Sequence, residues 1–460
     1  MNKKLIKILA IVLGAVLCVA LAAGIAVKKT QPFREPTTYP YVFVHGLNGY
    51  GTDIVSSDRA PYWGSTAGDL LHELEYRGYT CVAPSGGASA SAWDRACELY
   101  AALTGTTVDY GEAHSQEFGH ERFGNENPIP LLPDWGKTDD QGNVQKINLV
   151  GHSFGGASAR MLTELLAYGS EQERHWTPED CSPLFMGGQE DMVFSVTALT
   201  APHNGTTLLE LTSVGIVQSS VGLLDKLLQS PLGQLAQGAL GLFGIDLNEP
   251  LAGQSSLSDM LKMAQTRDNA YYDLTLHGAW SLNNHIRTLP NIYYFSHPAD
   301  GTQEGKNGTR VPVEEEMFAP LRVSAGIMGS FNFKDVTFGG TPLDHTWLPN
   351  DGLVPTVSML APSDALKENF SRFEVEQNVS EWEENAGFFS RFNAAPYADN
   401  IQRGVWNVYS TMRGDHAKPV GLNQEKSWLV EFYLEQMELI DHLSREETKG
   451  WAYSVLKDKD

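Results

Sequence analysis

The sequence predicts an α/β protein built on a mostly parallel, doubly wound sheet, and two observations support this prediction. Short apolar stretches typical of buried strands alternate along the chain with segments of helical apolar spacing. One such strand and helix are joined by Gly151-His152-Ser153-Phe154-Gly155, which puts a serine at the tip of a sharp turn. With 460 residues, 42% of them hydrophobic, the chain can form one large domain or two or three smaller ones.

The first predicted elements surround a glycine-rich loop. Residues 41–44 are a buried strand, and His45-Gly46-Leu47-Asn48-Gly49 follows it directly. Residues 68–77 have helical spacing and end at Gly78, where a left-handed residue commonly terminates a helix. Later strands are predicted over residues 80–83, 147–150, 193–199 and 291–295, and helices over residues 156–166 and 427–443.

The N-terminal segment is expected to direct export, so that the protein is secreted or held at the cell surface. Residues 8–27 are 20 uncharged, mostly apolar positions flanked by lysines, and Ala20-Leu21-Ala22 offers a signal-peptide cleavage pattern. The run is also just long enough to span a bilayer, so residues 1–27 are either a signal peptide or an N-terminal membrane anchor. The other predicted boundaries are a linker over residues 28–39, the main domain over residues 40–445 and a C-terminal tail over residues 446–460.

Charge and cysteine content limit the partners and the covalent framework. The formal net charge of −23 argues against nucleic acid or an anionic membrane as a partner, because both would repel the chain. Of the four cysteines, Cys18 lies in the N-terminal segment, which leaves Cys81, Cys97 and Cys181. Three cysteines in a domain of this size do not make a disulfide framework, and we expect buried free thiols.

Residues 206–265 differ from the rest of the chain. They are predicted to form short apolar helices broken by glycine and proline, and they follow directly after a strand of the sheet. One interpretation is a buried helical insertion. The other is a lid whose apolar face covers the active site in water and turns outward at a lipid surface.

Ser153 is the candidate nucleophile, and it requires a base and an acid. In α/β-hydrolases the chain order is serine, then the acid, then histidine, and downstream Asp351 and His416 fit this order. The alternatives are that Asp351 is only a turn residue and that His416 belongs to a solvated loop, and Asp344 and Asp415 are rival acids. The oxyanion hole is expected from two backbone N–H groups, those of Leu47 and Phe154.

At this point the chain resembles a known family, the zinc-containing secreted lipases of the staphylococcal and thermophilic-bacillus type. The resemblance covers roughly residues 40–444 and implies an α/β-hydrolase fold with a helical lid. It also implies hydrolysis of carboxylic esters, chiefly acylglycerols, through an acyl-enzyme on Ser153, with Asp351 as the acid and His416 as the base. The matching segments include His45-Gly46-Leu47, Tyr62-Trp63-Gly64, Trp93-Asp94-Arg95-Ala96-Cys97-Glu98, Thr107-Val108-Asp109-Tyr110-Gly111, Pro202-His203-Asn204-Gly205-Thr206-Thr207 and Gly404-Val405-Trp406-Asn407.

The resemblance further implies a structural zinc site at Asp94, His114, His120 and Asp268. From the residues alone, two histidines six positions apart with two distant carboxylates are a weak metal signal, and surface-loop histidines are the alternative. Oxygen and nitrogen ligands suit zinc, and four protein ligands leave no open position for catalysis. The expected zinc-binding subdomain comprises residues 94–124 and 266–285.

Two features depart from the family pattern. The family has a calcium-ligating glutamate two residues after the catalytic histidine, where this chain has Lys418. A protonated lysine cannot ligate calcium and repels it, so we expect the calcium site to be absent. The loop over residues 125–146 is longer than in the family, and the sequence does not indicate its role.

Three functional hypotheses follow from these residues. The first is a triacylglycerol lipase acting on lipid substrates at an oil–water interface, which the apolar insertion favours. The second is a carboxylesterase for short or soluble esters that uses the same residues. The third is a surface binding protein that retains a hydrolase fold without activity, against which the complete set of Ser153, Asp351 and His416 argues.

Overall fold

The computed structural model describes residues 39–54, 60–140, 142–210, 263–333, 335–363, 370–372 and 401–457. The chain divides into two units, residues 1–37 and 38–460, and every described residue belongs to the second. The predicted signal or anchor segment over residues 1–27, and nearly all of the linker, therefore lie outside the described residues. Among the helices of the described ranges, none is both long and apolar enough to cross a membrane.

A seven-stranded sheet forms the centre of the domain. Its strand order is β13-β14-β7-β6-β5-β1-β2, and every pair of neighbouring strands is parallel, which confirms the predicted sheet type. The strands β1, β5 and β6 are buried along their whole length, as expected for a parallel sheet covered on both faces. The strand bounds are β1 Tyr41–Val44, β2 Cys81–Val82, β5 Ile147–His152, β6 Val193–Leu199, β7 Tyr293–His297, β13 Phe370–Arg372 and β14 Trp406–Val408.

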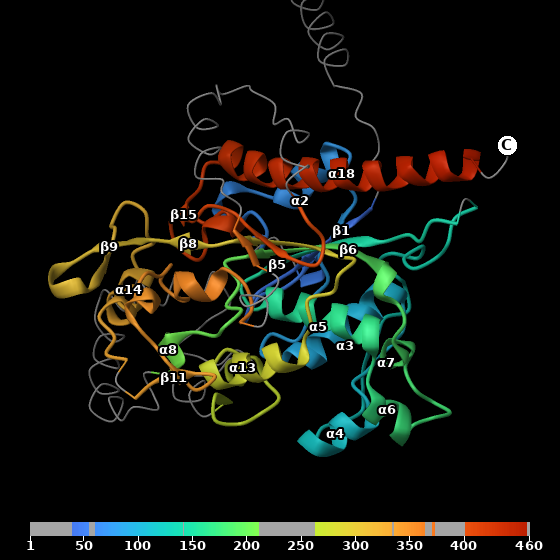
Figure 1. Cartoon of the computed structure of the whole chain (residues 1–460), viewed down its shortest axis with the longest axis horizontal. Coiled ribbons are helices and arrows are strands. Elements are labelled where there is room, and N and C mark those ends of the chain that lie inside the picture. Colours follow the sequence, from blue (N-terminus) through green and yellow to red (C-terminus); the bar gives the residue numbers. More distant parts are fainter. Residues whose placement is uncertain are drawn as a thin grey trace, which may run out of the picture. The chain divides into compact units, whose positions relative to one another are not determined.

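Helices cover both faces of this sheet (Figure 1). On one face lie α3 (Ala92–Thr104) and α5 (Gly155–Tyr168), whose apolar side chains share one core with β5. On the other lie α2 (Leu70–Tyr76) and α18 (Lys426–Lys457), which form a second core with β1. Parallel strands place their carboxyl ends at one edge, so the loops after β1, β5 and β6 meet there.

The smaller elements form helices and two-stranded sheets around this framework. The helices are α4 Glu112–Phe118, α6 Glu171–Trp176, α7 Pro183–Met186, α8 Thr207–Glu210, α12 Ala270–Asp273, α13 Leu276–His285 and α14 Leu321–Gly329. The paired strands are β3 Thr107–Asp109 with β4 Phe123–Glu126, β8 Ala299–Asp300 with β15 Met412–Arg413, β9 Thr302–Glu304 with β10 Arg310–Pro312, and β11 Thr337–Phe338 with β12 Thr341–Pro342.

The last helix is longer than the sequence pattern predicted. The prediction ended it at residue 443, with a tail over residues 446–460, whereas α18 continues to Lys457. Glu447 on this extension forms ion pairs with Lys146 and Arg403, each at 2.9 Å. These ion pairs connect the start of the extension to two segments that are distant in sequence.

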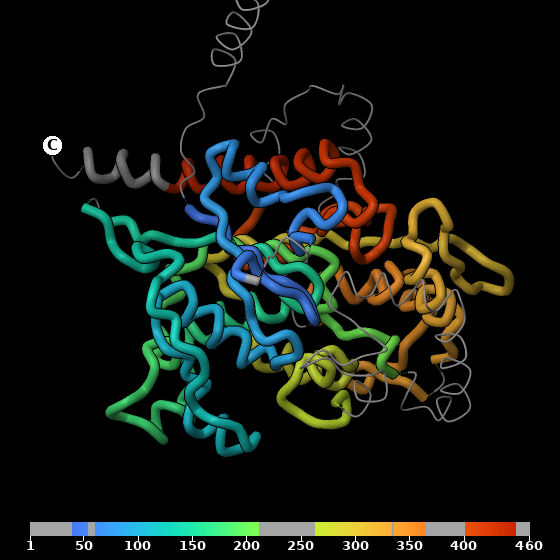
Figure 2. Tube along the Cα trace, turned by 180° about the vertical axis from the view of Figure 1, so that it is seen from behind, coloured from blue at the N-terminus to red at the C-terminus, as the bar shows by residue number. Residues whose placement is uncertain are grey.

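The long loop over residues 125–146 has a packing role that the sequence did not reveal. Leu132 and Trp135 are buried in the core beneath α3, and the Trp135 indole N–H donates to the carbonyl of Met192 at 2.9 Å. Its last residue, Lys146, reaches α18 through the ion pair with Glu447, and the view from behind shows the loop running toward that helix (Figure 2). The loop therefore connects the two faces of the sheet.

The cysteines behave largely as expected for free thiols. Cys81 and Cys97 are buried and unpaired with one another, which confirms the prediction for these two residues. Cys181 is also free but only partly buried. Burial raises the pKa of the Cys97 thiol well above its usual value, so this thiol is protonated and chemically inert.

Candidate active site

Ser153 lies at the carboxyl edge of the sheet, between β5 and α5. Its backbone has a φ of 55°, in the left-handed region that a serine rarely adopts, and its N–H donates to the carbonyl of Leu199 at 2.9 Å. This strained turn projects the side chain out of the strand line, toward the loops that follow β1 and β6. The expected strand, turn and helix are all present.

Glycines on both sides of Ser153 permit this turn. A Cβ atom on Gly155 would lie 2.1 Å from the carbonyl oxygen of Val44, and one on Gly151 would lie 2.6 Å from the backbone of Gly155. Both distances are far below van der Waals contact. Only glycine therefore allows α5 to start this close to β1 and β5.

Asp351 and His416 are joined in the fold although 65 positions separate them. His416 Nδ1 lies 2.7 Å from Asp351 Oδ2, and the other carboxylate oxygen accepts the N–H groups of Leu353 and Val354 at 3.0 and 2.8 Å. Since a carboxylate only accepts, His416 carries its proton on Nδ1 and leaves Nε2 as the basic nitrogen. Asp351 is 0% exposed, so this pair is shielded from water.

His416 also lies against the residue that precedes the serine. The His152 and His416 rings are 5.0 Å apart, and His152 Nε2 lies 2.9 Å from the carbonyl oxygen of His416. A direct hydrogen bond between His416 and the Ser153 hydroxyl is not among those of the described residues. Catalytic hydrogen bonds of this type are often long in a free enzyme and tighten when substrate binds.

The two rival acids are engaged elsewhere. Asp344 is exposed and accepts from the N–H and hydroxyl of Thr346. Asp415 is buried, but its carboxylate accepts the N–H groups of Phe318 and Ala417 at 2.6 and 3.0 Å. Of the three candidates, Asp351 is the one paired with the His416 ring.

The loop after β1 supplies the first expected oxyanion donor, Leu47. The neighbouring Asn48 fixes it through its N–H to the carbonyl of Ala88 and its side chain to the hydroxyl of Tyr271, at 2.8 and 3.1 Å. Among the hydrogen bonds of the described residues, none uses the N–H of Leu47 or of Phe154 as a donor. Both groups are therefore available to a ligand.

The buried side chain of Arg95 holds the loop after β1 by hydrogen bonds. Its guanidinium donates to the carbonyls of His45 and Gly46, and it lies 5.4 Å from the centre of the Phe154 ring. Burial lowers the pKa of Arg95 to about 10. This value is still well above 7, so the guanidinium stays protonated near neutral pH. One side chain thus contacts both segments that carry the expected oxyanion donors, a role that the sequence did not reveal.

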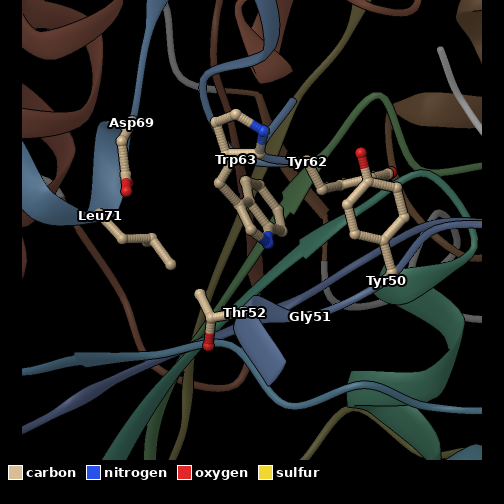
Figure 3. A pocket seen from close by; sticks show the side chains of 8 residues that line it. Tyr50, Gly51, Thr52, Tyr62, Trp63, Asp69 and Leu71 are labelled. Atoms are coloured by element: carbon tan, nitrogen blue, oxygen red, sulfur yellow. The ribbon is translucent and has the colours of Figure 1, made fainter. Parts of the chain in front are cut away.

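Tyr62 contacts the loop after β1 and also lines a small cavity (Figure 3). The cavity has a volume of about 330 Å³ and is lined by Tyr50, Tyr62, Trp63 and Asp69 among others. Neither Ser153 nor His416 lines it, so the cavity is separate from the candidate catalytic residues. The Tyr62 hydroxyl accepts the N–H of Gly46 at 2.8 Å and lies 2.6 Å from His152 Nδ1.

Four residues that are distant in sequence form a group able to hold a metal ion: Asp94, His114, His120 and Asp268. The His114 Nε2 atom is 3.1 Å from an Asp94 oxygen and 3.2 Å from an Asp268 oxygen, and His120 Nε2 is 3.3 Å from the other Asp268 oxygen. Ligands about 2.0–2.1 Å from a tetrahedral ion lie about 3.3 Å from one another, so these spacings suit a shared ion.

The proton positions in this group also fit a metal. His120 Nδ1 lies 2.9 Å from the carbonyl of Glu121, to which it must donate, so Nε2 presents a lone pair toward the Asp268 carboxylate. That Nε2 atom is buried without a hydrogen-bond partner among the described residues. A cation held between the neutral His120 ring and the Asp268 carboxylate would satisfy both acceptors, so the residues present fit a metal ion.

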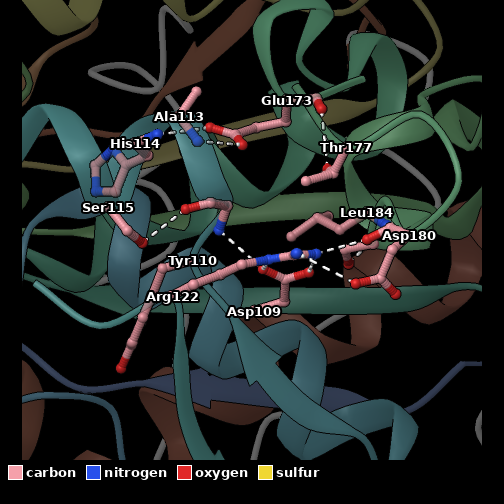
Figure 4. Close-up of polar contacts among 12 residues, drawn as sticks. Asp109, Tyr110, Ala113, His114, Ser115, Arg122, Glu173, Thr177, Asp180 and Leu184 are labelled. Carbon is pink, nitrogen blue, oxygen red and sulfur yellow. Dashed lines mark hydrogen bonds and ion pairs between the residues drawn. The ribbon is translucent and has the colours of Figure 1, made fainter. Parts of the chain in front are cut away.

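A second layer of contacts orients the histidine-bearing helix α4 (Figure 4). Buried Glu173 accepts the N–H groups of Ala113 and His114 at 3.0 and 2.8 Å, which caps the N-terminus of α4. Trp93 stacks on the His114 ring with the planes 14° apart. Arg122, two residues after His120, is held by the carboxylate of Asp109 at 2.8 and 2.9 Å.

Lys418 bridges the segments on either side of His416. Its ammonium donates to the carbonyl of Arg413 at 2.7 Å and lies 4.7 Å from the centre of the Trp428 ring. Burial lowers the pKa of Lys418 from its usual value. A positive charge at this position ties the histidine loop to the start of α18.

The predicted lid lies mostly outside the described residues, which resume at residue 263 after residue 210. Its described start is fixed beside the loop that carries Asp351, since the Thr206 hydroxyl donates to the carbonyl of Leu353 at 2.6 Å. Glu210 accepts the N–H of Leu276 at 3.0 Å. The described start of the segment is therefore anchored in the domain, and the function of the segment as a lid stays a prediction.

Comparison with known proteins identifies the family. The model of a family described as "Lipase-like, C-terminal domain" matches residues 37–450, so the chain belongs to this family. It is similar to "Lipase 1" of Staphylococcus aureus (strain MRSA252), with 31% identity over 412 residues that cover 88% of this chain and 54% of the relative. The chain thus spans about half the length of the curated relatives it matches.

Two solved structures share both the fold and part of the sequence. The crystal structure of Staphylococcus hyicus lipase has a TM-score of 0.66 and 28% identity, and the match covers 91% of this chain and 99% of that one. The structure of EstA from Clostridium botulinum has a TM-score of 0.64 and 30% identity, with 90% of each chain covered. These matches confirm the resemblance to staphylococcal-type lipases and the α/β-hydrolase-like fold.

The metal group leads to a prediction about composition and stability. We expect the purified protein to hold about one divalent metal ion per chain, because four ligands converge on one point. His120→Ala should lose the ion and lower the thermal unfolding midpoint, whereas His175→Ala, which removes an exposed histidine of helix α6, should change neither. Elemental analysis with calorimetry measures both. A folded wild-type protein without bound metal would contradict the assignment.

Proposed function

We propose that this protein is a secreted lipase that hydrolyses carboxylic ester bonds of acylglycerols through an acyl-enzyme on Ser153. The observation that carries the proposal is the buried Asp351–His416 pair, lying against the residue that precedes a strained Ser153. Membership of a lipase family supports the reaction class. Export depends on residues 1–27, and activity found only in the cytoplasmic fraction of the producing cell would refute it.

In the first half-reaction, Ser153 Oγ attacks the ester carbonyl carbon while His416 Nε2 takes the hydroxyl proton. The carbonyl oxygen becomes an oxyanion that accepts the N–H groups of Leu47 and Phe154, and each such donor is worth about 10²–10³ in kcat. His416 then gives the proton to the departing alcohol. Asp351 stays ionised throughout and stabilises the imidazolium.

In the second half-reaction, water replaces the alcohol. His416 Nε2 takes a proton from the water as its oxygen attacks the acyl carbon, and the same backbone N–H groups hold the oxyanion. Ser153 Oγ leaves with the proton from His416, and the fatty acid is released. Acyl transfer to an alcohol instead of water would use the same intermediate.

We also propose that the metal held by Asp94, His114, His120 and Asp268 is a structural zinc. Its four protein ligands leave no position for substrate or water, so it would supply no chemistry to the reaction. It would tie the 94–124 segment to Asp268, which follows the predicted lid. The elemental analysis described above decides between zinc and another divalent ion.

The assignment of Ser153, Asp351 and His416 as catalytic residues predicts how substitutions at these positions affect kcat. Ser153→Ala and His416→Ala should each lower kcat by at least about 10⁴-fold, and Asp351→Asn by about 10⁴-fold through the wrong histidine tautomer. Asp344→Asn makes the same change at an exposed rival acid and should have almost no effect. A serine-reactive phosphonate should label Ser153 in the wild type. An unlabelled, inactive wild type would favour the surface binding protein.

Substrate class is tested by a chain-length series of nitrophenyl esters and by triacylglycerol emulsions. If the 206–265 insertion is a lid, we expect kcat/KM to rise with acyl length, and activity to increase sharply once substrate forms an interface. Soluble substrates below their solubility limit provide the control. A preference for acetyl and butyryl esters without interfacial activation would instead indicate a carboxylesterase.

The position of Lys418 predicts that activity and stability do not depend on calcium. Because the Lys418 ammonium bridges the segments on either side of His416, we propose that no calcium ion is required there. A calcium-selective chelator should leave kcat and the unfolding temperature unchanged. Loss of activity that only added calcium restores would contradict this proposal.

A further inference from the structure

We propose that Tyr62 and His152 are positioning residues. Their hydrogen bonds align three segments: the loop after β1 that carries Leu47 (the oxyanion loop), the turn at Ser153 (the nucleophile turn) and the loop that carries His416 (the histidine loop). Neither side chain has a role in the proton transfers described above. The inference rests on the proposed function, because it concerns how the parts of that site are held in register.

The hydrogen bonds form one chain with a defined direction. A carbonyl only accepts, so His152 Nε2 carries a proton and donates to His416 at 2.9 Å. His152 Nδ1 must then accept from the Tyr62 hydroxyl at 2.6 Å, and the Tyr62 oxygen accepts the N–H of Gly46 at 2.8 Å. This series of hydrogen bonds therefore connects Gly46, the residue before Leu47, through His152, the residue before Ser153, to His416 itself.

Burial fixes the protonation states that this direction requires. His152 is 2% exposed, and burial together with the neighbouring His416 lowers the pKa of His152 to about 3. Burial likewise raises the pKa of Tyr62 above its usual value, so the phenol stays protonated. The link is thus a set of neutral hydrogen bonds that does not change over the working pH range of a lipase.

The loop after β1 and the turn at Ser153 approach each other closely beside Tyr62. A Cβ atom on Gly46 would lie 2.8 Å from Ser153 Cβ, 2.9 Å from the Tyr62 oxygen and 3.2 Å from the carbonyl of His152. A shift of a few tenths of an ångström in one of these two segments would therefore displace the other. Catalysis by positioned groups is sensitive to displacements of this size.

The test compares Tyr62→Phe with the wild type on a soluble nitrophenyl ester. The substitution removes only the hydroxyl, which leaves the N–H of Gly46 and His152 Nδ1 without a partner. We expect kcat per phosphonate-titrated site to fall by about 10- to 100-fold with KM nearly unchanged. The affinity for a trifluoromethyl ketone, which forms an oxyanion on the serine, should fall by a similar factor.

A double-mutant cycle tests whether the two residues act as one link. His152→Leu breaks both hydrogen bonds of the imidazole, so adding Tyr62→Phe to it should reduce kcat little further. Independent structural roles would instead give multiplicative losses. His152→Gln, which retains a donor for the His416 carbonyl, should recover part of the activity that His152→Leu loses.

Tyr41→Phe is the matched control. Tyr41 begins β1, at the end of that strand opposite Gly46, and its buried hydroxyl donates to the carbonyl of Met437 and the carboxylate of Asp441 at 3.0 and 2.9 Å. This variant should lose a similar amount of stability but keep its kcat per titrated site.

The outcomes separate the inference from the proposed function. If the wild type is labelled at Ser153 and hydrolyses esters while Tyr62→Phe keeps full kcat per titrated site, the positioning link is wrong and the lipase proposal stands. Equal kcat losses in Tyr62→Phe and Tyr41→Phe would also overturn the link. If the wild type neither hydrolyses esters nor reacts with the phosphonate, the proposed function itself fails.

Discussion

The hydrogen bond between the Asp351 carboxylate and the His416 ring is the interaction on which the functional site depends. It joins two loops that are 65 positions apart, at a carboxylate with no exposed surface. Two further N–H groups satisfy the other Asp351 oxygen, so the buried charge is fully hydrogen-bonded. In the proposed mechanism this arrangement leaves Nε2 of His416 free to act on the serine, and the fold that brings the two loops together is then a precondition of the chemistry.

Helix α3 connects two parts of the molecule that the sequence presents as separate. Asp94 belongs to the metal group, whereas the next residue, Arg95, holds the oxyanion loop. Consecutive helical side chains point about 100° apart, so a single helix can serve both sites. A metal that fixed the start of α3 would therefore also fix Arg95 and the loop after β1, and a structural ion would then have a mechanical effect on the proposed catalysis.

Much of the framework could be predicted from the sequence, because apolar runs and turn residues are local signals. The strands over residues 41–44 and 193–199 occur with the predicted bounds. Arg95, Tyr62 and His152 could not be found in this way, since they bind backbone groups of distant segments and no periodic pattern marks such contacts. Their only sequence signal was their position, since Tyr62 and Arg95 lie in segments that match the lipase family and His152 directly precedes Ser153. The sequence pattern also ended the last helix too early, and Glu447 beyond the predicted end forms ion pairs with Lys146 and Arg403 that no local pattern marks.

A crystal structure of the protein with a covalent phosphonate tests the central claim most directly. We expect phosphorus bonded to Ser153 Oγ, the phosphoryl oxygen about 2.7–3.1 Å from the N–H groups of Leu47 and Phe154, and His416 Nε2 within hydrogen-bonding distance of the adduct. An adduct on another residue, or a His416 ring still paired with Asp351 but turned away from the bound phosphonate, would contradict the assignment of these three side chains to one catalytic unit.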